Sequence, residues 1–281
     1  MTFWNELQGA EFCQRYIDCA GVRTRIVETG AGARALILLH GVQGHLEVWL
    51  RNVAAFGARH RVVAFDLLGH GFTGKPDRPY EIRDYLEHAL VLLDTLGIKR
   101  ATWIGSSLGG WISARAAAQF PERVEKLVLV STAGLSADPA VMAKLKTLGE
   151  RAAAMSGPDG VRERLKFVIH DPANVTDELV DSRWRIYSRP EYRAALAHIN
   201  ALQEMTRRER NLLTSDELSR IKAPTLIIWT DHDPTASLAK GRDYQASIPG
   251  AKFVIIPHCS HVPSYESPAE FNRVVLEFLA T

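Results

Sequence analysis

Cysteine is scarce in this chain of 281 residues, which contains three, Cys13, Cys19 and Cys259. An odd number of cysteines in a chain long enough to bury a full core argues against a disulfide framework and favours reduced thiols. His258 and His261 flank Cys259, but no further Cys/His cluster completes a zinc site. We therefore expect a cytoplasmic protein that holds no metal.

Long apolar runs are also absent. No stretch reaches the ~18 apolar residues that a membrane-spanning helix requires. The first residues, MTFWNELQGAEF, contain neither the basic segment nor the apolar segment of an export signal. We expect neither membrane insertion nor export.

Neither sign of charge is in large excess, because the formal net charge is +2 at pH 7. The Lys and Arg residues are dispersed along the chain, whereas a nucleic-acid surface concentrates them on one face. Nucleic acid is therefore not an expected partner.

Short β-branched runs alternate with helical patterns along most of the sequence. Alternation of this kind predicts a mostly parallel sheet with helices on both faces. Segment 80–97 repeats apolar residues with a helical period and stops at Gly97, as a helix C-terminus does. The eight predicted strands lie within 13–21, 22–30, 35–41, 61–71, 100–105, 126–132, 223–230 and 252–257.

The alternation is interrupted between Thr132 and Pro224, where Ala, Leu, Arg and Glu are frequent and no strand is evident. This interval is far longer than the ~2–6 residues that usually connect elements of such sheets. It predicts a helical insertion after the sixth strand. We place the core domain at residues 1–135 and 215–281 and the insertion at residues 136–214.

Two serines lie side by side in WIGSSLGG, where an apolar strand stops and a small-residue helix begins. A nucleophile elbow holds its middle residue in a strained turn above the sheet and needs small residues on either side. In the frame Gly105-Ser106-Ser107-Leu108-Gly109, that residue is Ser107 and not Ser106. A Gly/Ser-rich turn without chemistry is the alternative, and the strand-turn-helix context favours the elbow.

A serine nucleophile also needs N–H donors for its oxyanion and a base for its proton. The loop HGVQG offers the backbone N–H of Val42, and the helix that begins after Ser107 offers the backbone N–H of Leu108.

The base is expected in the C-terminal part of the chain. His261 lies in a loop beyond the last strand and is the better base than His258. Asp231 and Asp233 both follow the preceding strand, and one of them is expected to be only a turn former or helix N-cap. Four other histidines occur in helical or capping contexts that suit a solvated or packed histidine: His60, His88, His170 and His198.

An arginine stands in an apolar helix face within VTDELVDSRWRIY, a helix predicted to be capped by Thr176. Arg183 projects from the face that also carries Trp184, whereas Arg185 points to solvent. A guanidinium in an apolar stripe is costly unless it meets an anion. A salt bridge with a core carboxylate and a bound ligand are equally compatible with the residues alone.

These motifs resemble the α/β-hydrolase fold, and most closely the meta-cleavage-product hydrolases, which split a C–C bond in dienoates formed by opening aromatic rings. The chain order Ser107, Asp, His261 is that of the fold, and the family's strand-end pattern selects Asp233 as the acid. The resemblance covers nearly all of the chain. The matching stretches are HGVQGHLEVW, VVAFDLLGHGFTGKPD, IGSSLGGW, DELVDSRWRIY, APTLIIWTDHD and HCSHVPSYESPAEFN.

The resemblance implies a cofactor-free serine hydrolase of a small-molecule dienoate, with the insertion as a helical cap. It also implies a homodimer or larger homo-oligomer. Arg183 would bind the substrate carboxylate. Further residues expected around the substrate are Gly41, Ser106, Trp111, Trp184 and Val262.

The chain departs from the family in three places. It has HGVQGH where HGSGPG is common, Ser106 where Asn is frequent, and Val262 where Trp is common. Carboxylesterases and lactonases of the same fold share the triad motifs and are the alternative function. A ligand receptor that retains the fold and triad is a third.

Overall fold

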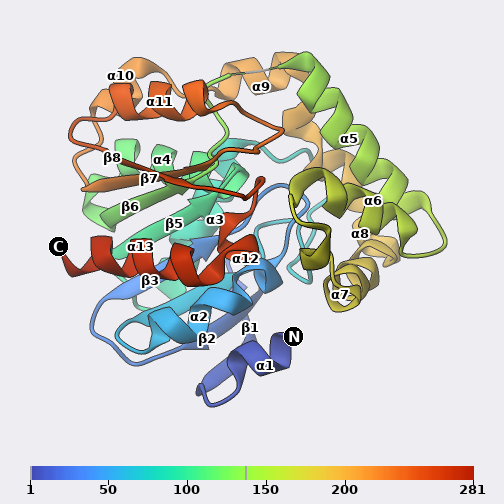
Figure 1. The fold of residues 1–281 in the computed structure, drawn as a ribbon, viewed down its shortest axis with the longest axis horizontal. Helices are drawn as coiled ribbons and strands as arrows, with labels where there is room; N and C mark the ends of the chain where they lie inside the picture. The colour runs from blue at the N-terminus through green and yellow to red at the C-terminus, as the bar shows by residue number, and fades with distance from the viewer. Residues whose placement is uncertain (1, 137) are drawn as a thin grey trace.

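The computed structural model describes residues 2–136 and 138–281, and the predicted strands form one sheet of eight (Figure 1). Their order across the sheet is β1-β2-β4-β3-β5-β6-β7-β8. The strands are β1 (Phe12–Cys19), β2 (Val22–Thr29), β3 (Ala35–Leu39), β4 (Arg61–Phe65), β5 (Ala101–Ser106), β6 (Val124–Val130), β7 (Thr225–Thr230) and β8 (Lys252–Ile256).

The sheet is mostly parallel, as predicted. β1 pairs antiparallel with β2, and β2 pairs antiparallel with β4, whereas every pairing from β4 to β8 is parallel. The central strands β3, β5 and β7 are buried along their whole length, which is why their sequences are continuous apolar runs and do not alternate.

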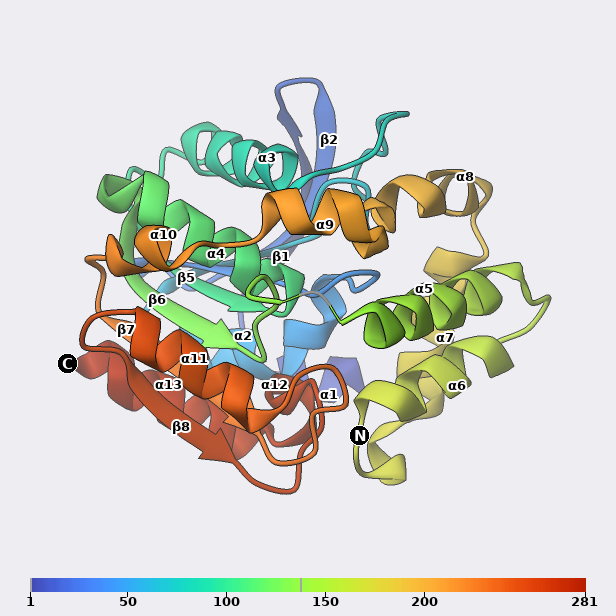
Figure 2. The same cartoon turned by 90° about the horizontal axis from the view of Figure 1, so that it is seen from above.

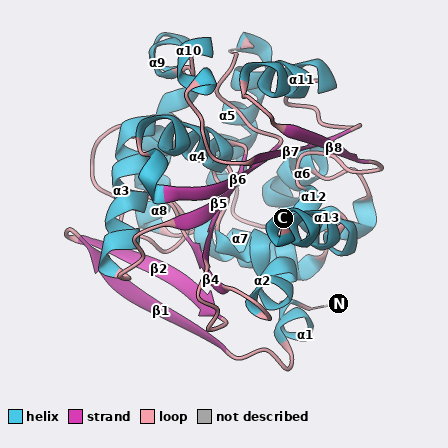
Figure 3. Cartoon of the chain, turned by 90° about the vertical axis from the view of Figure 1, so that its left-hand side faces the viewer, coloured by secondary structure: helices cyan, strands magenta, loops and turns pink. Residues whose placement is uncertain are grey.

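Helices cover both faces of the sheet (Figure 3). Each face has its own apolar cluster. Residues of α3, α4, α10 and α11 contribute to one cluster, and those of α2 and α13 to the other. The bounds are α1 (Phe3–Leu7), α2 (Leu50–Gly57), α3 (Ile82–Thr95), α4 (Leu108–Gln119), α10 (Ser215–Ser219), α11 (Leu238–Ser247), α12 (Pro263–Glu266) and α13 (Pro268–Ala280), with short 3₁₀ turns at Leu46–Trp49 and Pro121–Arg123.

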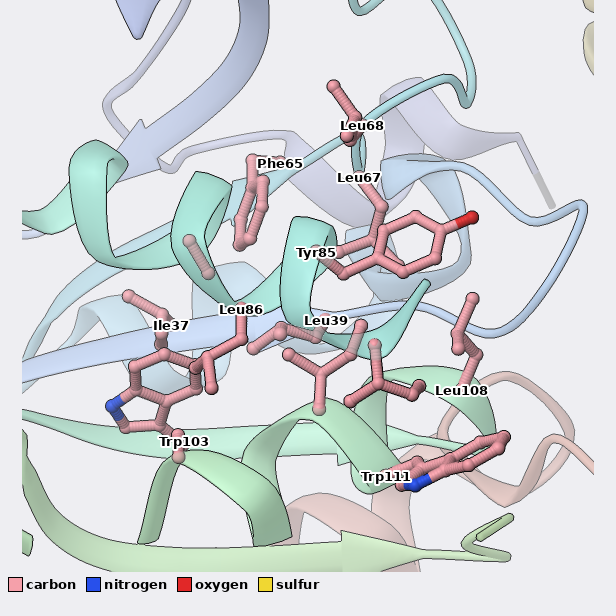
Figure 4. Packing of buried hydrophobic residues seen from close by; sticks show 14 of the residues in the cluster. Ile37, Leu39, Phe65, Leu67, Leu68, Tyr85, Leu86, Trp103, Leu108 and Trp111 are labelled. Carbon is pink, nitrogen blue, oxygen red and sulfur yellow. The ribbon is translucent and has the colours of Figure 1, made fainter. Parts of the chain in front are cut away.

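Figure 4 shows part of the larger cluster, in which Trp103 packs near Ile37 and Leu86. Trp111 lies at the other end of this view, beside Leu108 at the start of α4. The apolar core thus reaches the turn that follows β5.

The interval between β6 and β7 folds as helices, and no strand occurs in its described part. We call helices α5 to α9 the helical insertion; it lies beyond the ends of β6 and β7 in Figure 2. Its bounds are α5 (Pro139–Ala154), α6 (Asp159–Val168), α7 (Asp177–Tyr187), α8 (Pro190–Ile199) and α9 (Met205–Asn211), with 3₁₀ turns at Pro172–Asn174 and Ala201–Gln203. Within the two described ranges, no helix is long and apolar enough to cross a membrane.

Candidate functional site

Ser107 occupies the sharp turn between β5 and α4. Its φ of 54° and ψ of −113° are strained for a residue with a side chain. Ser106 ends strand β5 and has no positive φ. A Cβ on Gly105 would overlap the carbonyl of Gly109, and one on Gly109 would overlap the backbone of Leu39. The glycines therefore allow the helix to begin against the ends of β3 and β5.

His261 and Asp233 meet at the loops that follow β8 and β7. His261 Nδ1 lies 2.9 Å from Asp233 Oδ2, and Thr235 Oγ1 donates to the other carboxylate oxygen at 2.7 Å. The same hydroxyl lies 3.0 Å from His261 Nδ1. Burial alone raises the pKa of Asp233, but the charge of His261 and the donated hydrogen bonds outweigh it and hold the pKa below its ordinary value.

Asp231 has a different role in the same loop. One of its carboxylate oxygens accepts the backbone N–H of His258 at 3.1 Å, and both residues are exposed. Asp231 therefore braces the turn after β8, whereas Asp233 holds the imidazole of His261.

The loop after β3 lies directly against the elbow. A Cβ on Gly41 would lie 3.1 Å from Ser107 Cβ, so glycine permits this approach. Among the described residues, neither the Val42 N–H nor the Leu108 N–H donates a hydrogen bond. Two backbone donors are therefore free close to Ser107, which is the chemistry that an oxyanion needs.

His40 holds this loop through two hydrogen bonds of its ring, and it was not identified from the sequence. Its Nε2 accepts the Leu67 N–H at 3.1 Å, so Nδ1 carries the proton and donates to Gly41 O at 2.7 Å. Burial lowers the pKa of His40 to about 4, so the ring is neutral at pH 7. The only sequence signal was its position immediately before Gly41.

Two cavities meet at Ser107. The first, which we call the Arg183 cavity, contains Ser107 and His261 together with Arg183. Its further lining includes five predicted or neighbouring positions: Gly41, Val42, Ser106, Val262 and Arg164. The second, the Trp111 cavity, shares Ser107, Val42 and Leu145 and is otherwise lined by both apolar and polar residues.

Arg183 projects from the buried face of α7, whose N-cap Thr176 accepts the Leu179 N–H as predicted. Its Nε donates to His45 Nε2 at 3.3 Å. No carboxylate in the described ranges pairs with it, so the salt-bridge alternative finds no direct partner. Burial lowers the pKa of the guanidinium. Arg185 is exposed and pairs with Asp181.

Arg164 is a second buried cation in the Arg183 cavity, and sequence reasoning missed it. It lies in α6 and is 3 % exposed. Its Nη1 donates to Leu145 O at 3.1 Å, and its Nε has no partner among the described residues. The available signal was its place beside Leu165 on the apolar face of that helix.

A family model described as "alpha/beta hydrolase fold" matches residues 34–268. The chain belongs to the alpha/beta hydrolase fold family. The resemblance found in the sequence is thereby confirmed at the level of the family and the fold.

Relatives of this alpha/beta hydrolase carry related names. A 2-hydroxy-6-oxononadienedioate/2-hydroxy-6-oxononatrienedioate hydrolase of Burkholderia vietnamiensis is 32% identical over 93% of this chain and 92% of its own. A 2-hydroxymuconate semialdehyde hydrolase of Pseudomonas putida is 29% identical over 95% and 94%. The solved 2-hydroxy-6-oxo-6-phenylhexa-2,4-dienoate hydrolase of a Rhodococcus strain is 22% identical, covers 97% of this chain and 100% of its own, and has a TM-score of 0.86.

Two predicted residues of this alpha/beta hydrolase lie in different surroundings. Trp111 is fully buried and lines the Trp111 cavity. Trp184 lines neither cavity; it is partly buried, and the Arg193 guanidinium lies 6.0 Å above its ring. The helical period placed Trp184 on the same face of α7 as Arg183. Part of that face lines the Arg183 cavity and part packs against the core, so the two residues have different surroundings.

One exposed group of metal-ligand type exists in this alpha/beta hydrolase, counted over residues 2–136 and 138–281: Asp231, His232 and His258. The ring of His170 stacks on His232 at 3.9 Å. The group includes His258 but neither Cys259 nor His261, the other two residues of the sequence pattern that resembles a metal pair. It lines neither cavity, and the absence of a metal stays a prediction.

Proposed function

We propose that this hydrolase cleaves a C–C bond in a 2-hydroxy-6-oxo-dienoate, a product of aromatic ring opening. The observation that carries the proposal is the pair Arg183 and Arg164, two buried guanidinium groups that meet no carboxylate among the described residues. Both line the cavity that contains Ser107 and His261. A buried cation without a counter-ion is costly, and a substrate carboxylate removes that cost.

Ser107, His261 and Asp233 act as a triad in this proposal. Asp233 accepts the Nδ1–H of His261 and fixes the tautomer that leaves Nε2 free to take a proton. Thr235 secures Asp233 from its other oxygen. Because Nε2 is the free base, His261 removes the proton of Ser107 or of a water molecule that Ser107 positions.

The reaction then balances as the addition of one water. The bound dienol loses the proton of its 2-hydroxyl and takes up a proton at C5, which gives the C2 ketone, after which the nucleophile attacks the C6 carbonyl. The oxyanion accepts hydrogen bonds from the N–H groups of Val42 and Leu108. When the C5–C6 bond breaks, its electron pair moves onto the C2 oxygen of the five-carbon fragment, which takes up the proton that His261 removed. The acyl fragment leaves as a carboxylic acid, directly when water is the nucleophile and after hydrolysis of the ester when Ser107 is.

We further propose that residues 136–214 form a cap on the core domain of residues 1–135 and 215–281. Contacts between the insertion and the loop after β3 support this division. Tyr187 donates its hydroxyl to Gln43 O at 2.6 Å, and the Gln43 amide donates to Asn200 Oδ1 at 2.5 Å. The Arg183 bond to His45 is a third link.

Turnover of two substrate types tests the proposed function. A coloured 2-hydroxy-6-oxo-dienoate and a neutral aryl ester are each supplied to the purified wild-type chain and to Ser107→Ala. We expect rapid loss of the dienoate colour, and at least a ~10³-fold lower rate in the variant, the scale typical of triad members.

Ser106→Ala is the matched control and should retain most of the activity, because Ser106 ends the strand and does not occupy the strained turn. Rapid hydrolysis of the ester with no loss of dienoate would replace the proposal by the esterase or lactonase alternative. Inertness toward both would favour the receptor, and equal losses in the two serine variants would refute the assignment of Ser107.

A further inference from the structure

His45 contacts Arg183 from outside the Arg183 cavity. It is the last residue of HGVQGH, the loop in which this chain departs from the family pattern. The residue is fully buried and lines neither cavity. Its Nε2 accepts the Nε–H of Arg183 at 3.3 Å, which is the one hydrogen bond between this guanidinium and a described residue. Arg183 is therefore held by a group that leaves the space for a substrate open.

The other ring nitrogen of His45 is bonded to Glu47. His45 Nδ1 lies 2.6 Å from Glu47 Oε2. A carboxylate can only accept, so Nδ1 carries the proton and Nε2 is left as an acceptor. Burial lowers the pKa of His45, so the ring is neutral at pH 7 and Nε2 keeps the lone pair that accepts from Arg183.

Glu47 is itself fixed by Arg25 of β2. The Nη1 and Nη2 groups of Arg25 each donate to one carboxylate oxygen of Glu47 at 2.7 Å, and its Nε donates to Asp66 at 2.7 Å. Asp66 follows β4, is fully buried and also accepts the Leu46 N–H at 2.8 Å. The imidazole of His45 is therefore held by a hydrogen-bonded network that begins in the sheet.

The bond to His45 restricts how Arg183 presents its remaining donors. A guanidinium is planar, so a hydrogen bond at Nε fixes the plane in which the two terminal NH2 groups lie. Neither NH2 group of Arg183 donates to a described residue, and Arg183 lines the cavity beside Ser107. A carboxylate binds most strongly when it accepts from both NH2 groups at once.

A neutral ring suits the position beside Arg183 Nε for a second reason. A carboxylate there would form an ion pair with Arg183 and would compete with an anionic substrate. The like charge of Arg164 in the same cavity repels the guanidinium of Arg183. The bond to His45 opposes this displacement without neutralising the charge.

We infer that His45, oriented by Glu47, is a positioning residue that holds Arg183 with both terminal NH2 groups toward the substrate carboxylate. The inference rests on the proposed function and adds to it the two residues that orient the carboxylate-binding arginine. His45 contacts neither the substrate nor the reacting atoms. Its loss should therefore weaken dienoate binding only through Arg183.

Two substitutions of His45 separate its two hydrogen bonds. In His45→Asn, the side-chain amide still donates to Glu47 from the place of Nδ1 but is too short to accept from Arg183. In His45→Gln, the amide oxygen reaches the place of Nε2 and accepts from Arg183. We expect His45→Asn to raise KM for the dienoate by about tenfold, the scale of a hydrogen bond to a charged group, and His45→Gln to avoid most of this loss.

The neutral aryl ester serves as the reference substrate, and kcat/KM for it should be unchanged in both variants. A double variant tests whether His45 acts through Arg183: once Arg183→Gln is present, His45→Asn should have no further effect on the dienoate KM. His198→Asn is the control, because His198 of α8 also bonds a carboxylate, that of Asp77 at 2.7 Å, and lines neither cavity. It should leave both substrates unaffected.

An unchanged dienoate KM in His45→Asn would overturn the inference and leave the proposed function intact. Equal losses on both substrates with a lower melting temperature, or additive effects in the double variant, would make His45 a purely structural residue and would also overturn it. A wild-type chain that does not turn over the dienoate would refute the proposed function, and the inference with it.

Discussion

Hydrogen bonds at single residues distinguish the two acids that follow β7. The side chain of Asp233 is 1 % exposed and bonded to the imidazole of His261, whereas Asp231 is bonded to a backbone N–H. Asp233→Asn should therefore lower kcat for the dienoate by ~10³- to 10⁴-fold, because an amide no longer fixes the tautomer of His261.

The matched change Asp231→Asn should alter kcat only slightly, since an amide oxygen still accepts the His258 N–H. Steady-state kinetics on both variants, with circular dichroism to verify folding, measure the difference. A larger loss in Asp231→Asn than in Asp233→Asn would show that the assignment of the acid is wrong.

Residues that sequence reasoning found and missed differ in where their partners lie. Ser107 was predictable because the strand, turn and helix that strain it are adjacent in the chain. Thr235 carries no such local signal. Thr235 matters because its loop follows β7 and that of His261 follows β8, and the parallel pairing of these two strands brings the loops together, a contact that no local pattern encodes.

Helices and strands were predictable where burial is uniform or strictly periodic. Helix α7 began after Thr176 as expected, and its buried face includes Arg183. Helix α9 is short and reads MTRRERN, so it has no apolar stripe that would reveal that Arg208 is buried.

The order of the strands across the sheet is a second feature that could not be predicted from the sequence. β4 lies between β2 and β3, and this placement depends on pairings between distant segments. The position of Trp184 outside both cavities could not be predicted either. A helical period shows which residues share a face of the helix, but not which other elements cover each part of that face.

For the molecule as a whole, buried neutral histidines connect folding to pH. Burial lowers the pKa of His40 and of His88 to about 4, below the ordinary value of about 6.5. These residues bind protons in the unfolded chain at a higher pH than in the folded one. The free energy of unfolding should therefore be highest above pH 6.5 and fall as the pH drops toward 4, by about 1.4 kcal/mol per pH unit for each such histidine.

Urea denaturation at a series of pH values measures this slope. His88 is distant from the candidate site and bonds Thr24 Oγ1 at 2.8 Å. His88→Gln should keep a donor for that hydroxyl and reduce the slope by one histidine's share. Identical slopes for wild type and variant between pH 6.5 and 5 would contradict the assignment of His88 as a buried neutral residue.

The homo-oligomer predicted from the sequence does not depend on these histidines. Light scattering of the purified chain measures the oligomeric state.

The central claim is that Arg183 binds the substrate carboxylate beside Ser107, and Arg183→Gln tests it most directly. The measurement is kcat/KM for a dienoate and for a neutral aryl ester, in this variant and in Arg185→Gln, the exposed control on the same helix. We predict that Arg183→Gln lowers dienoate turnover by about ten- to a thousandfold and spares the ester, while Arg185→Gln changes neither. Equal losses on both substrates, or a large fall in melting temperature in Arg183→Gln, would contradict the account.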